Sequence, residues 1–231
     1  MVSLPDNALT TLTAVADELD DYTVGTNDSR VVRYIATASS AFEQDTNRKW
    51  YWVEGYTENV EGYDTRRLVV DEHRPISSID DITFDDGTIK TDISPSTWEI
   101  EDAGKGWIRR VSGRWVDTGD RRRDIDINIA GGTQAGLYRV TYGGGYITPQ
   151  QDDDDVGDRT LPWDIEQAII DYVVMLWHMR GRDHSISSES LLSGSASYTN
   201  LIDTLVSTPS GRIVPPTYRD AIRRYADVGM G

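Results

Sequence analysis

The chain has 231 residues, enough for one large domain or two small ones with a buried core. A hydrophobic content of 38% argues against global disorder. The sequence contains no apolar run of about 18 residues, the length that would span a membrane. The absence of cysteine excludes disulfides and thiolate chemistry. The opening residues lack a charged segment followed by an apolar one, so we expect no secretory signal.

The charge balance is strongly acidic, with 39 acidic against 23 basic residues and a formal net charge of −16. Aspartate makes up 29 of the acids, and only three of the bases are lysine. Short carboxylates with few lysine stems are typical of proteins in concentrated salt, where the Debye length is only about 3 Å at 1 M and self-repulsion is screened. We therefore expect a halophilic source, with an ordinary acidic mesophilic protein as the alternative.

The first 50 residues show a helical period. Apolar residues from Leu9 to Leu19 recur at three- and four-residue steps, and a second stripe runs from Val31 to Phe42. A polar break at 25–29 separates the two helices, which we expect to pack antiparallel. The expected N-caps are Asp6 or Asn7 for the first helix and Asp28 or Ser29 for the second.

From residue 51 to 148 the period changes to two, and β-branched and aromatic residues become frequent. Turn signals at 85–87 and 112–113 favour hairpins, and no alternation with helices indicates parallel crossovers. We expect an antiparallel sheet or a small barrel whose tryptophans are mostly core. The expected strands are 68–70, 82–84, 98–100, 107–111, 125–129 and 138–142.

A stronger helical period returns after Leu161, and this helix is apolar on two faces. Such a helix needs more partners than one sheet supplies, so either a deep core or a subunit contact is indicated. The residues of the two faces are Ile165, Ile169, Ile170, Tyr172, Val173, Val174, Leu176 and Trp177. A Ser- and Gly-rich stretch follows, then a possible short helix at 201–206 and an amphipathic segment at 218–225.

Together these patterns predict an α+β fold. An N-terminal helical pair (1–50) and the long later helix form a small bundle, with a central antiparallel β domain at 51–148. An acidic loop and the main packing helix occupy 149–186, and a C-terminal arm occupies 187–231. No internal repeat is visible.

The acidic and histidine motifs do not make a metal or catalytic site. The run Asp152 to Asp155 lacks the spaced ligands and turn glycine of a calcium loop. Asp124 and Asp126 are expected on the wet face of a half-buried strand. The three histidines, His73, His178 and His184, lack the one-turn spacing of a shared metal.

The glycine and serine motifs also fail as catalytic signatures. Gly143 to Gly145 is not followed by the Lys-Ser/Thr of a phosphate loop, so we interpret it as a sharp bend. The segment 194–198 departs at its last position from the nucleophile elbow of hydrolases. We expect no catalytic residues, no bound metal and no cofactor.

One cluster combines arginines with tryptophans. Alone it could bind single-stranded nucleic acid by stacking, but concentrated salt weakens phosphate contacts by orders of magnitude. We interpret it as salt bridging with neighbouring acids or an adjacent subunit. Its residues are Trp107, Arg109, Arg110, Arg114, Trp115, Arg121, Arg122 and Arg123.

Three segments, read in order, resemble a known family. The first, 36–50, is a small-residue helix with Phe42-Glu43, followed by Thr46, Arg48 and an aromatic residue that opens a strand. In the second, 74–82, Pro75 leads into a strand. The third, 138–180, has a Gly-rich strand end, a polar loop and a helix after Leu161-Pro162. In order and spacing they resemble the head–tail connector (adaptor) proteins of long-tailed double-stranded DNA viruses, here with a virus of a halophilic archaeon as the expected source.

The resemblance implies a structural virion protein without catalytic residues. Such adaptors form a ring, usually a dodecamer, below the portal protein and receive the tail or its terminator protein. The ring extends the channel for double-stranded DNA, without sequence-specific binding or membrane contact. The implied location is the virion neck, with assembly in the host cytoplasm.

The family pattern ends near Ser187, so contact of the C-terminal arm with the portal or a neighbouring subunit is a hypothesis. This hypothesis predicts that deletion of residues 212–231 abolishes portal binding and leaves the fold intact. The residues expected in that contact are Ile213, Val214, Tyr218, Arg219, Ile222, Arg223 and Tyr225.

Three alternatives remain. A tail-completion or other neck protein would form a different ring. A carbohydrate-binding β module would be a monomer with exposed aromatics on one sheet face. A hydrolase would need two facing carboxylates about 5–10 Å apart.

Overall fold

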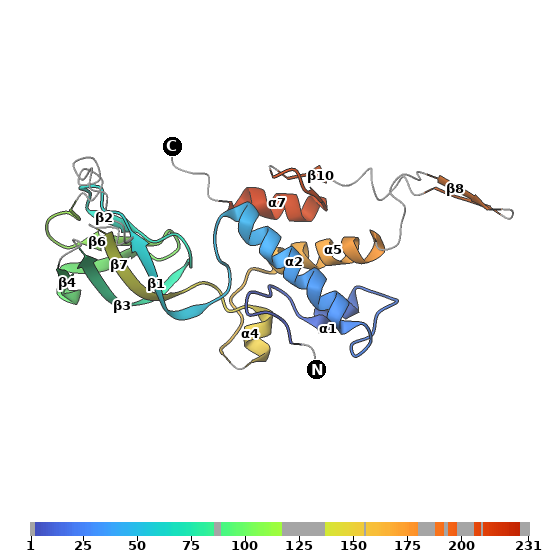
Figure 1. Ribbon diagram of the computed structural model, residues 1–231, viewed down its shortest axis with the longest axis horizontal. Coiled ribbons are helices and arrows are strands. Elements are labelled where there is room, and N and C mark those ends of the chain that lie inside the picture. Colours follow the sequence, from blue (N-terminus) through green and yellow to red (C-terminus); the bar gives the residue numbers. More distant parts are fainter. Residues whose placement is uncertain are drawn as a thin grey trace, which may run out of the picture. The chain divides into compact units, whose positions relative to one another are not determined.

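The computed structural model describes residues 3–85, 89–116, 137–154, 156–179, 188–191, 194–197, 206–208 and 210–226 (Figure 1). The chain divides into two compact units. The helical unit comprises residues 1–47 and 147–231, and the β unit comprises residues 48–146. Helices and antiparallel sheets together confirm the predicted α+β class.

The helical unit is built on α2, which packs against α5 and α7, while α5 also contacts α1 and α7 (Figure 1). The predicted apolar stripe of α2 faces this core, since Val31, Ile35 and Phe42 are fully buried. Two short antiparallel hairpins, β8–β9 and β10–β11, also belong to the unit. The element bounds are α1 Leu12–Asp17, α2 Asp28–Thr46, α4 Pro149–Asp153, α5 Trp163–Met179, β8 Ser188–Leu191, β9 Gly194–Ser197, β10 Val206–Ser207, β11 Ile213–Val214 and α7 Pro216–Tyr225.

The predicted helix caps are wrong. Helix α1 begins after Thr11, whose hydroxyl accepts from the Ala14 N–H at 3.2 Å. Asn7 instead donates from its side-chain amide to Glu43 of α2 at 3.1 Å. Asp28 accepts from the Gly25 N–H at 2.8 Å and so closes the loop before α2. These side chains serve tertiary and loop contacts, which helical periodicity does not encode.

The β unit holds two antiparallel sheets in its described part, and these do not close into the barrel considered from the sequence. One sheet has the order β1-β7-β3-β4 and the other β2-β6-β5. Five predicted strands are present, and the sixth, at 125–129, lies outside the described residues. The bounds are β1 Val53–Val60, β2 Arg67–Val69, β3 Ile76–Asp85, β4 Lys90–Asp92, η1 Pro95–Thr97, β5 Trp98–Asp102, β6 Trp107–Arg110 and β7 Leu137–Gly144.

An apolar core lies in the described part of the β unit, and residues from both sheets contribute to it. Its largest member is Trp115, which has no solvent exposure. Tyr142 of β7 adds a buried polar link, because its hydroxyl accepts from the His73 N–H at 3.1 Å and donates to Glu58 at 2.7 Å. The core therefore ties strands β1 and β7 to the segment before β3.

The glycine run 143–145 ends strand β7 as a sharp bend, which agrees with its interpretation from the sequence. Gly145 has φ +100° and donates its N–H to the Pro75 carbonyl at 2.9 Å. A Cβ there would overlap the Tyr51 carbonyl, and a Cβ at Gly144 would overlap that of His73. Glycine is required here by both backbone conformation and close packing.

Gly145→Ala should lower the free energy of unfolding by about 2–3 kcal/mol, because alanine is strained at positive φ and also collides with backbone. Urea unfolding of both proteins measures the difference. Gly113→Ala is the matched control, since Gly113 has φ +81° but open space at its Cβ. Equal losses for the two variants would show that the overlap with Tyr51 contributes nothing.

Candidate assembly surfaces

The two apolar faces of α5 are largely covered within the same chain. Tyr172 packs against Tyr218 of α7 with ring centroids 4.8 Å apart. Trp177 packs against Tyr22 at 5.6 Å, and its indole N–H donates to Asp21 at 2.7 Å. Of the residues expected in a subunit contact, Val174 and Leu176 are half-buried. The other six are buried: Ile165, Ile169, Ile170, Tyr172, Val173 and Trp177.

Helix α7 and strand β11 are integral to the helical unit. Tyr218 also meets Phe42 of α2 edge-on at 5.5 Å, and the Tyr225 hydroxyl donates to Asp164 of α5 at 2.9 Å. Among the residues expected to contact a portal or neighbour, Val214, Tyr218 and Ile222 are buried, Arg219 and Tyr225 are half-buried, and Ile213 and Arg223 are exposed.

The expectation that 212–231 can be deleted without disturbing the fold is therefore wrong. Removal of α7 would expose apolar surface of α2 and α5, because Tyr218 and Ile222 pack there at 0% and 3% exposure. A test of this segment must use point substitutions at exposed positions such as Ile213 and Arg223.

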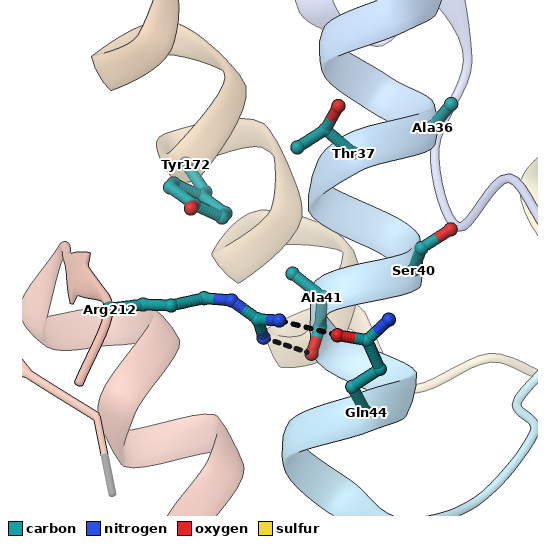
Figure 2. A pocket seen from close by; sticks show the side chains of 7 residues that line it. All are labelled: Ala36, Thr37, Ser40, Ala41, Gln44, Tyr172 and Arg212. Atoms are coloured by element: carbon teal, nitrogen blue, oxygen red, sulfur yellow. Dashed lines mark hydrogen bonds between the residues drawn. The ribbon is translucent and has the colours of Figure 1, made fainter. Parts of the chain in front are cut away.

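A groove of about 410 Å³ lies beside α2 and α5, with Arg212 at its edge (Figure 2). We call it the α2–α5 groove. Arg212 contacts α2 by an ion pair to Asp45 at 3.0 Å and hydrogen bonds to the Ala41 carbonyl at 3.2 Å and to Gln44. Asp45 is only 3% exposed, so this pair anchors the β10–β11 hairpin on α2. The groove is lined by Ala36, Thr37, Ser40, Ala41, Gln44, Tyr172 and Arg212.

Burial raises the pKa of the Tyr218 hydroxyl far above its usual range, and the Asp45 carboxylate adds to the rise. Burial likewise raises the pKa of Tyr172. Both tyrosines are therefore neutral near the groove, where Asp45 and Arg212 form the charged pair.

A second cavity, of about 470 Å³, surrounds the exposed Trp163 at the start of α5. The Arg159 guanidinium lies 3.4 Å from the Trp163 ring centroid and forms an ion pair with Glu166. Glu166 is 6% exposed and its other oxygen accepts from the Thr10 hydroxyl at 3.2 Å. Asp152 and Asp153 also line this cavity, which we call the Trp163 pocket.

Sequence patterns predict neither of these cavities. Trp163 lies in line with Ile170 and Trp177, on one of the two apolar faces of α5, so helical periodicity predicts burial where the structure shows exposure. The groove is completed by Arg212, which contacts α2 although it follows Ala41 by 171 residues in the sequence.

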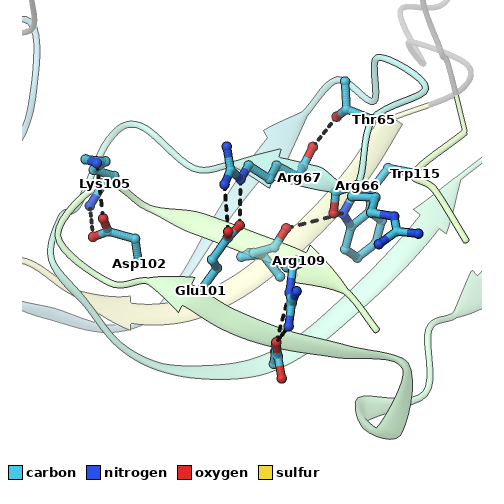
Figure 3. A network of polar contacts seen from close by, with 10 residues as sticks. Thr65, Arg66, Arg67, Glu101, Asp102, Lys105, Arg109 and Trp115 are labelled. Atoms are coloured by element: carbon cyan, nitrogen blue, oxygen red, sulfur yellow. Dashed lines mark hydrogen bonds and ion pairs between the residues drawn. The ribbon is translucent and has the colours of Figure 1, made fainter. Parts of the chain in front are cut away.

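In the β unit, the arginine–tryptophan cluster forms salt bridges in its described part (Figure 3). Arg67 makes a bidentate contact with Glu101 at 2.6 and 2.7 Å, and Arg109 pairs with Glu99. The mutual hydrogen bonds raise the pKa of Arg67 and lower that of Glu101. Arg114 pairs with Asp64 at 3.1 Å. These pairs support the salt-bridge interpretation of the cluster.

The tryptophan rings of the cluster are covered by cations of the same unit. Arg67 and Lys105 lie 4.2 and 4.4 Å from the Trp107 centroid, and Arg110 lies 4.6 Å from that of Trp115. Stacked bases or sugars would have to displace these groups. Arg121, Arg122 and Arg123 lie outside the described residues, as do Asp124 and Asp126.

Two of the segments that carry the family resemblance meet in the β unit. The Arg48 guanidinium lies 4.0 Å from the Trp50 ring centroid and donates to the Arg74 carbonyl, next to Pro75. Burial, followed by the charge of Arg74, lowers the pKa of Arg48 to about 10. Arg48 therefore remains a cation that joins the first β-unit residues to the segment leading into β3.

His73 is a buried titratable group in the same region. It is 1% exposed, lies between the rings of Tyr51 and Tyr56, and has Nδ1 3.1 Å from the Tyr51 carbonyl oxygen. Burial lowers its pKa below the ordinary value, against smaller opposing effects of the Tyr51 carbonyl and Glu72. The folded β unit therefore holds a neutral imidazole.

The free energy of unfolding should fall as the pH drops from 7 to 5. In the unfolded chain His73 has its ordinary pKa of about 6.5, whereas in the folded chain its pKa is lower. The unfolded chain therefore binds the proton more readily over this pH range, and protonation favours unfolding. The slope from this group is at most about 1.4 kcal/mol per pH unit. Urea titrations across this range should show a smaller slope for His73→Gln. An unchanged slope would mean that other groups produce the pH dependence.

No group of three or more His, Asp or Glu side chains in the described part of the chain is placed to hold a metal ion. Asp152 and Asp153 lie in α4, His178 is exposed at the end of α5, and His184 lies outside the described residues. None of the helices described is both long and apolar enough to cross a membrane.

The fold is similar to that of chains in gene transfer agent (GTA) particles. A chain in the neck of an empty GTA particle, computed with C6 symmetry, matches with a TM-score of 0.53 and 14% identity over 84% of this chain and 88% of that chain. A chain in the virion of a native GTA particle gives the same values. For the neck of the native particle with C12 symmetry, the TM-score is 0.50 at 14% identity, with 84% and 87% covered. No protein family and no curated protein matches the sequence.

Proposed function

We propose that the chain is a structural head–tail connector (adaptor) of a tailed virus or virus-like particle. In this role it forms a ring below the portal protein, joins the capsid to the tail, and lines the channel for double-stranded DNA without catalysis. The observation that carries the proposal is the fold likeness to chains from GTA necks, which extends over 84% of the residues. The order of the three sequence segments that resemble adaptors supports it independently.

A ring is the assembly that this proposal requires. Neck reconstructions of the similar particles with C6 and C12 symmetry support a ring of six or twelve copies. A dodecamer is the expected size from the adaptor resemblance. A strongly acidic ring would also suit a channel for DNA, because like charges disfavour adhesion to phosphates.

The test is native mass spectrometry and negative-stain imaging of the pure protein in concentrated KCl, with and without its portal protein. We expect a ring, either alone or templated on the portal. A monomer that ignores the portal would contradict the connector function. A ring that binds a tail protein but not the portal would instead support a tail-completion protein in another part of the neck.

We also propose that the protein works in concentrated salt, as its 29 aspartates and net charge of −16 suggest. Its melting temperature should rise with KCl concentration, by about 2–4 °C for each kcal/mol of self-repulsion that is screened. Differential scanning calorimetry from low to molar KCl measures this. A melting temperature that is constant or falls with salt would favour an ordinary acidic protein.

A further inference from the structure

Trp163 is the most exposed large apolar side chain among the described residues, at 75%. The other six of the seven tryptophans are buried or half-buried. Arg159 lies over the Trp163 ring and is itself paired with the buried Glu166. Tryptophan is among the side chains that dominate protein interfaces.

The α2–α5 groove faces away from Trp163. Tyr172, which lines the groove, follows Trp163 by nine residues on the same helix. Nine residues turn a helix by about 900°, which places the two side chains on opposite faces, about 13 Å apart along the axis. Trp163 therefore cannot reach the groove of its own chain, but it can reach that of another copy. Repetition of such a head-to-tail contact closes a ring when the rotation permits.

The groove has the size and chemistry to receive an indole ring. Its α2 wall consists of the small side chains of Ala36, Thr37, Ser40 and Ala41, which leave the space of about 410 Å³ (Figure 2). Tyr172 offers an aromatic surface, and the Arg212 guanidinium at the edge can lie against an incoming ring.

Exposed charges of opposite sign lie near the two surfaces. Asp152 and Asp153 are exposed and line the Trp163 pocket. Arg33 is exposed on α2 one turn before Thr37, and Arg30 is exposed a further turn away. Asp45, which follows Gln44 of the groove, is paired with Arg212. For a chain with a net charge of −16, a contact between copies needs such local complementarity.

We propose that Trp163 of one copy inserts into the α2–α5 groove of the next copy, with Asp152 and Asp153 facing Arg33 and Arg30. This contact would be the repeating head-to-tail joint of the ring, so the inference rests on the proposed connector function. A tryptophan buries about 150–250 Å², so it anchors an interface to which surrounding residues must add area.

One variant removes the inserting ring of the proposed joint, and a second variant blocks the receiving groove. Trp163→Ala deletes the inserted ring, and Thr37→Trp fills the groove from an exposed position on α2. Each variant should raise the protein concentration needed for half-assembly by about tenfold or more. The controls are Tyr63→Ala, which removes a 64% exposed aromatic of the β unit, and Thr91→Trp, which adds a ring at an exposed position of β4 in that unit. Circular dichroism verifies that all four fold.

A mixture of the two variants gives the sharper test. Trp163→Ala retains an open groove and Thr37→Trp retains the inserting ring, so one joint can form between them and no further copy can add. Native mass spectrometry, at a concentration where each variant alone is monomeric, should therefore show a 1:1 dimer in the mixture.

The outcomes separate this joint from the connector function. Normal rings from Trp163→Ala, or no 1:1 dimer in the mixture, would overturn the joint while the connector function stands. Failure of the unmodified protein to form a ring, with or without its portal, would overturn both.

Discussion

Trp115→Ala should lower the free energy of unfolding by about 3–5 kcal/mol. The side chain has no solvent exposure and packs edge-on against Tyr138 with centroids 5.1 Å apart. Its indole N–H also donates to the carbonyls of Arg66 at 3.1 Å and Ile108 at 3.3 Å (Figure 3). Alanine would leave a cavity between the strands and remove a donor from two backbone acceptors.

Urea unfolding followed by circular dichroism measures this loss. Trp107→Ala is the matched control, because Trp107 lies in strand β6 of the same unit but is half-exposed beneath Arg67 and Lys105. We expect the control to cost about 1 kcal/mol. Trp115→Phe should fall between them, since it keeps most of the packing and loses the indole donor. Similar losses at Trp107 and Trp115 would show that burial in the core does not set the cost.

Arg159→Ala should cost about 3–5 kcal/mol in the helical unit, because it leaves the Glu166 carboxylate buried without its cation. The two side chains are 12% and 6% exposed, so water cannot replace the lost partner. Thr10, whose hydroxyl donates to Glu166, is also fully buried. The substitution further removes the guanidinium that lies over Trp163.

Two comparisons test the reason for that loss. Replacing both Arg159 and Glu166 with leucine should recover much of the stability, because no buried charge remains. Arg114→Ala removes an ion pair whose members are both 62% exposed, and should cost at most about 1 kcal/mol. If the double variant is as unstable as Arg159→Ala, packing around Trp163 and not the buried charge is responsible.

In the β unit, local sequence patterns predict most strands but not how the strands pair. The strands at 68–70, 82–84, 98–100, 107–111 and 138–142 were predictable from β-branched and aromatic residues with a period of two. Strand β1 was not, because its sequence is polar and exposed at several positions, and pairing with β7 makes it a strand. The arrangement as two sheets was also left open, because periodicity describes one strand at a time.

The helical unit shows the same limit at the level of surfaces. The sequence by itself determined the α+β class, the stripe of α2 and the two apolar faces of α5. Only the tertiary structure decided that α7, about 50 residues beyond Trp163, covers part of α5, that Arg212 reaches Asp45, and that Trp163 stays exposed over Arg159. The physical reason is that an apolar stripe specifies which side of a helix needs burial, while the partner is chosen by packing among distant segments.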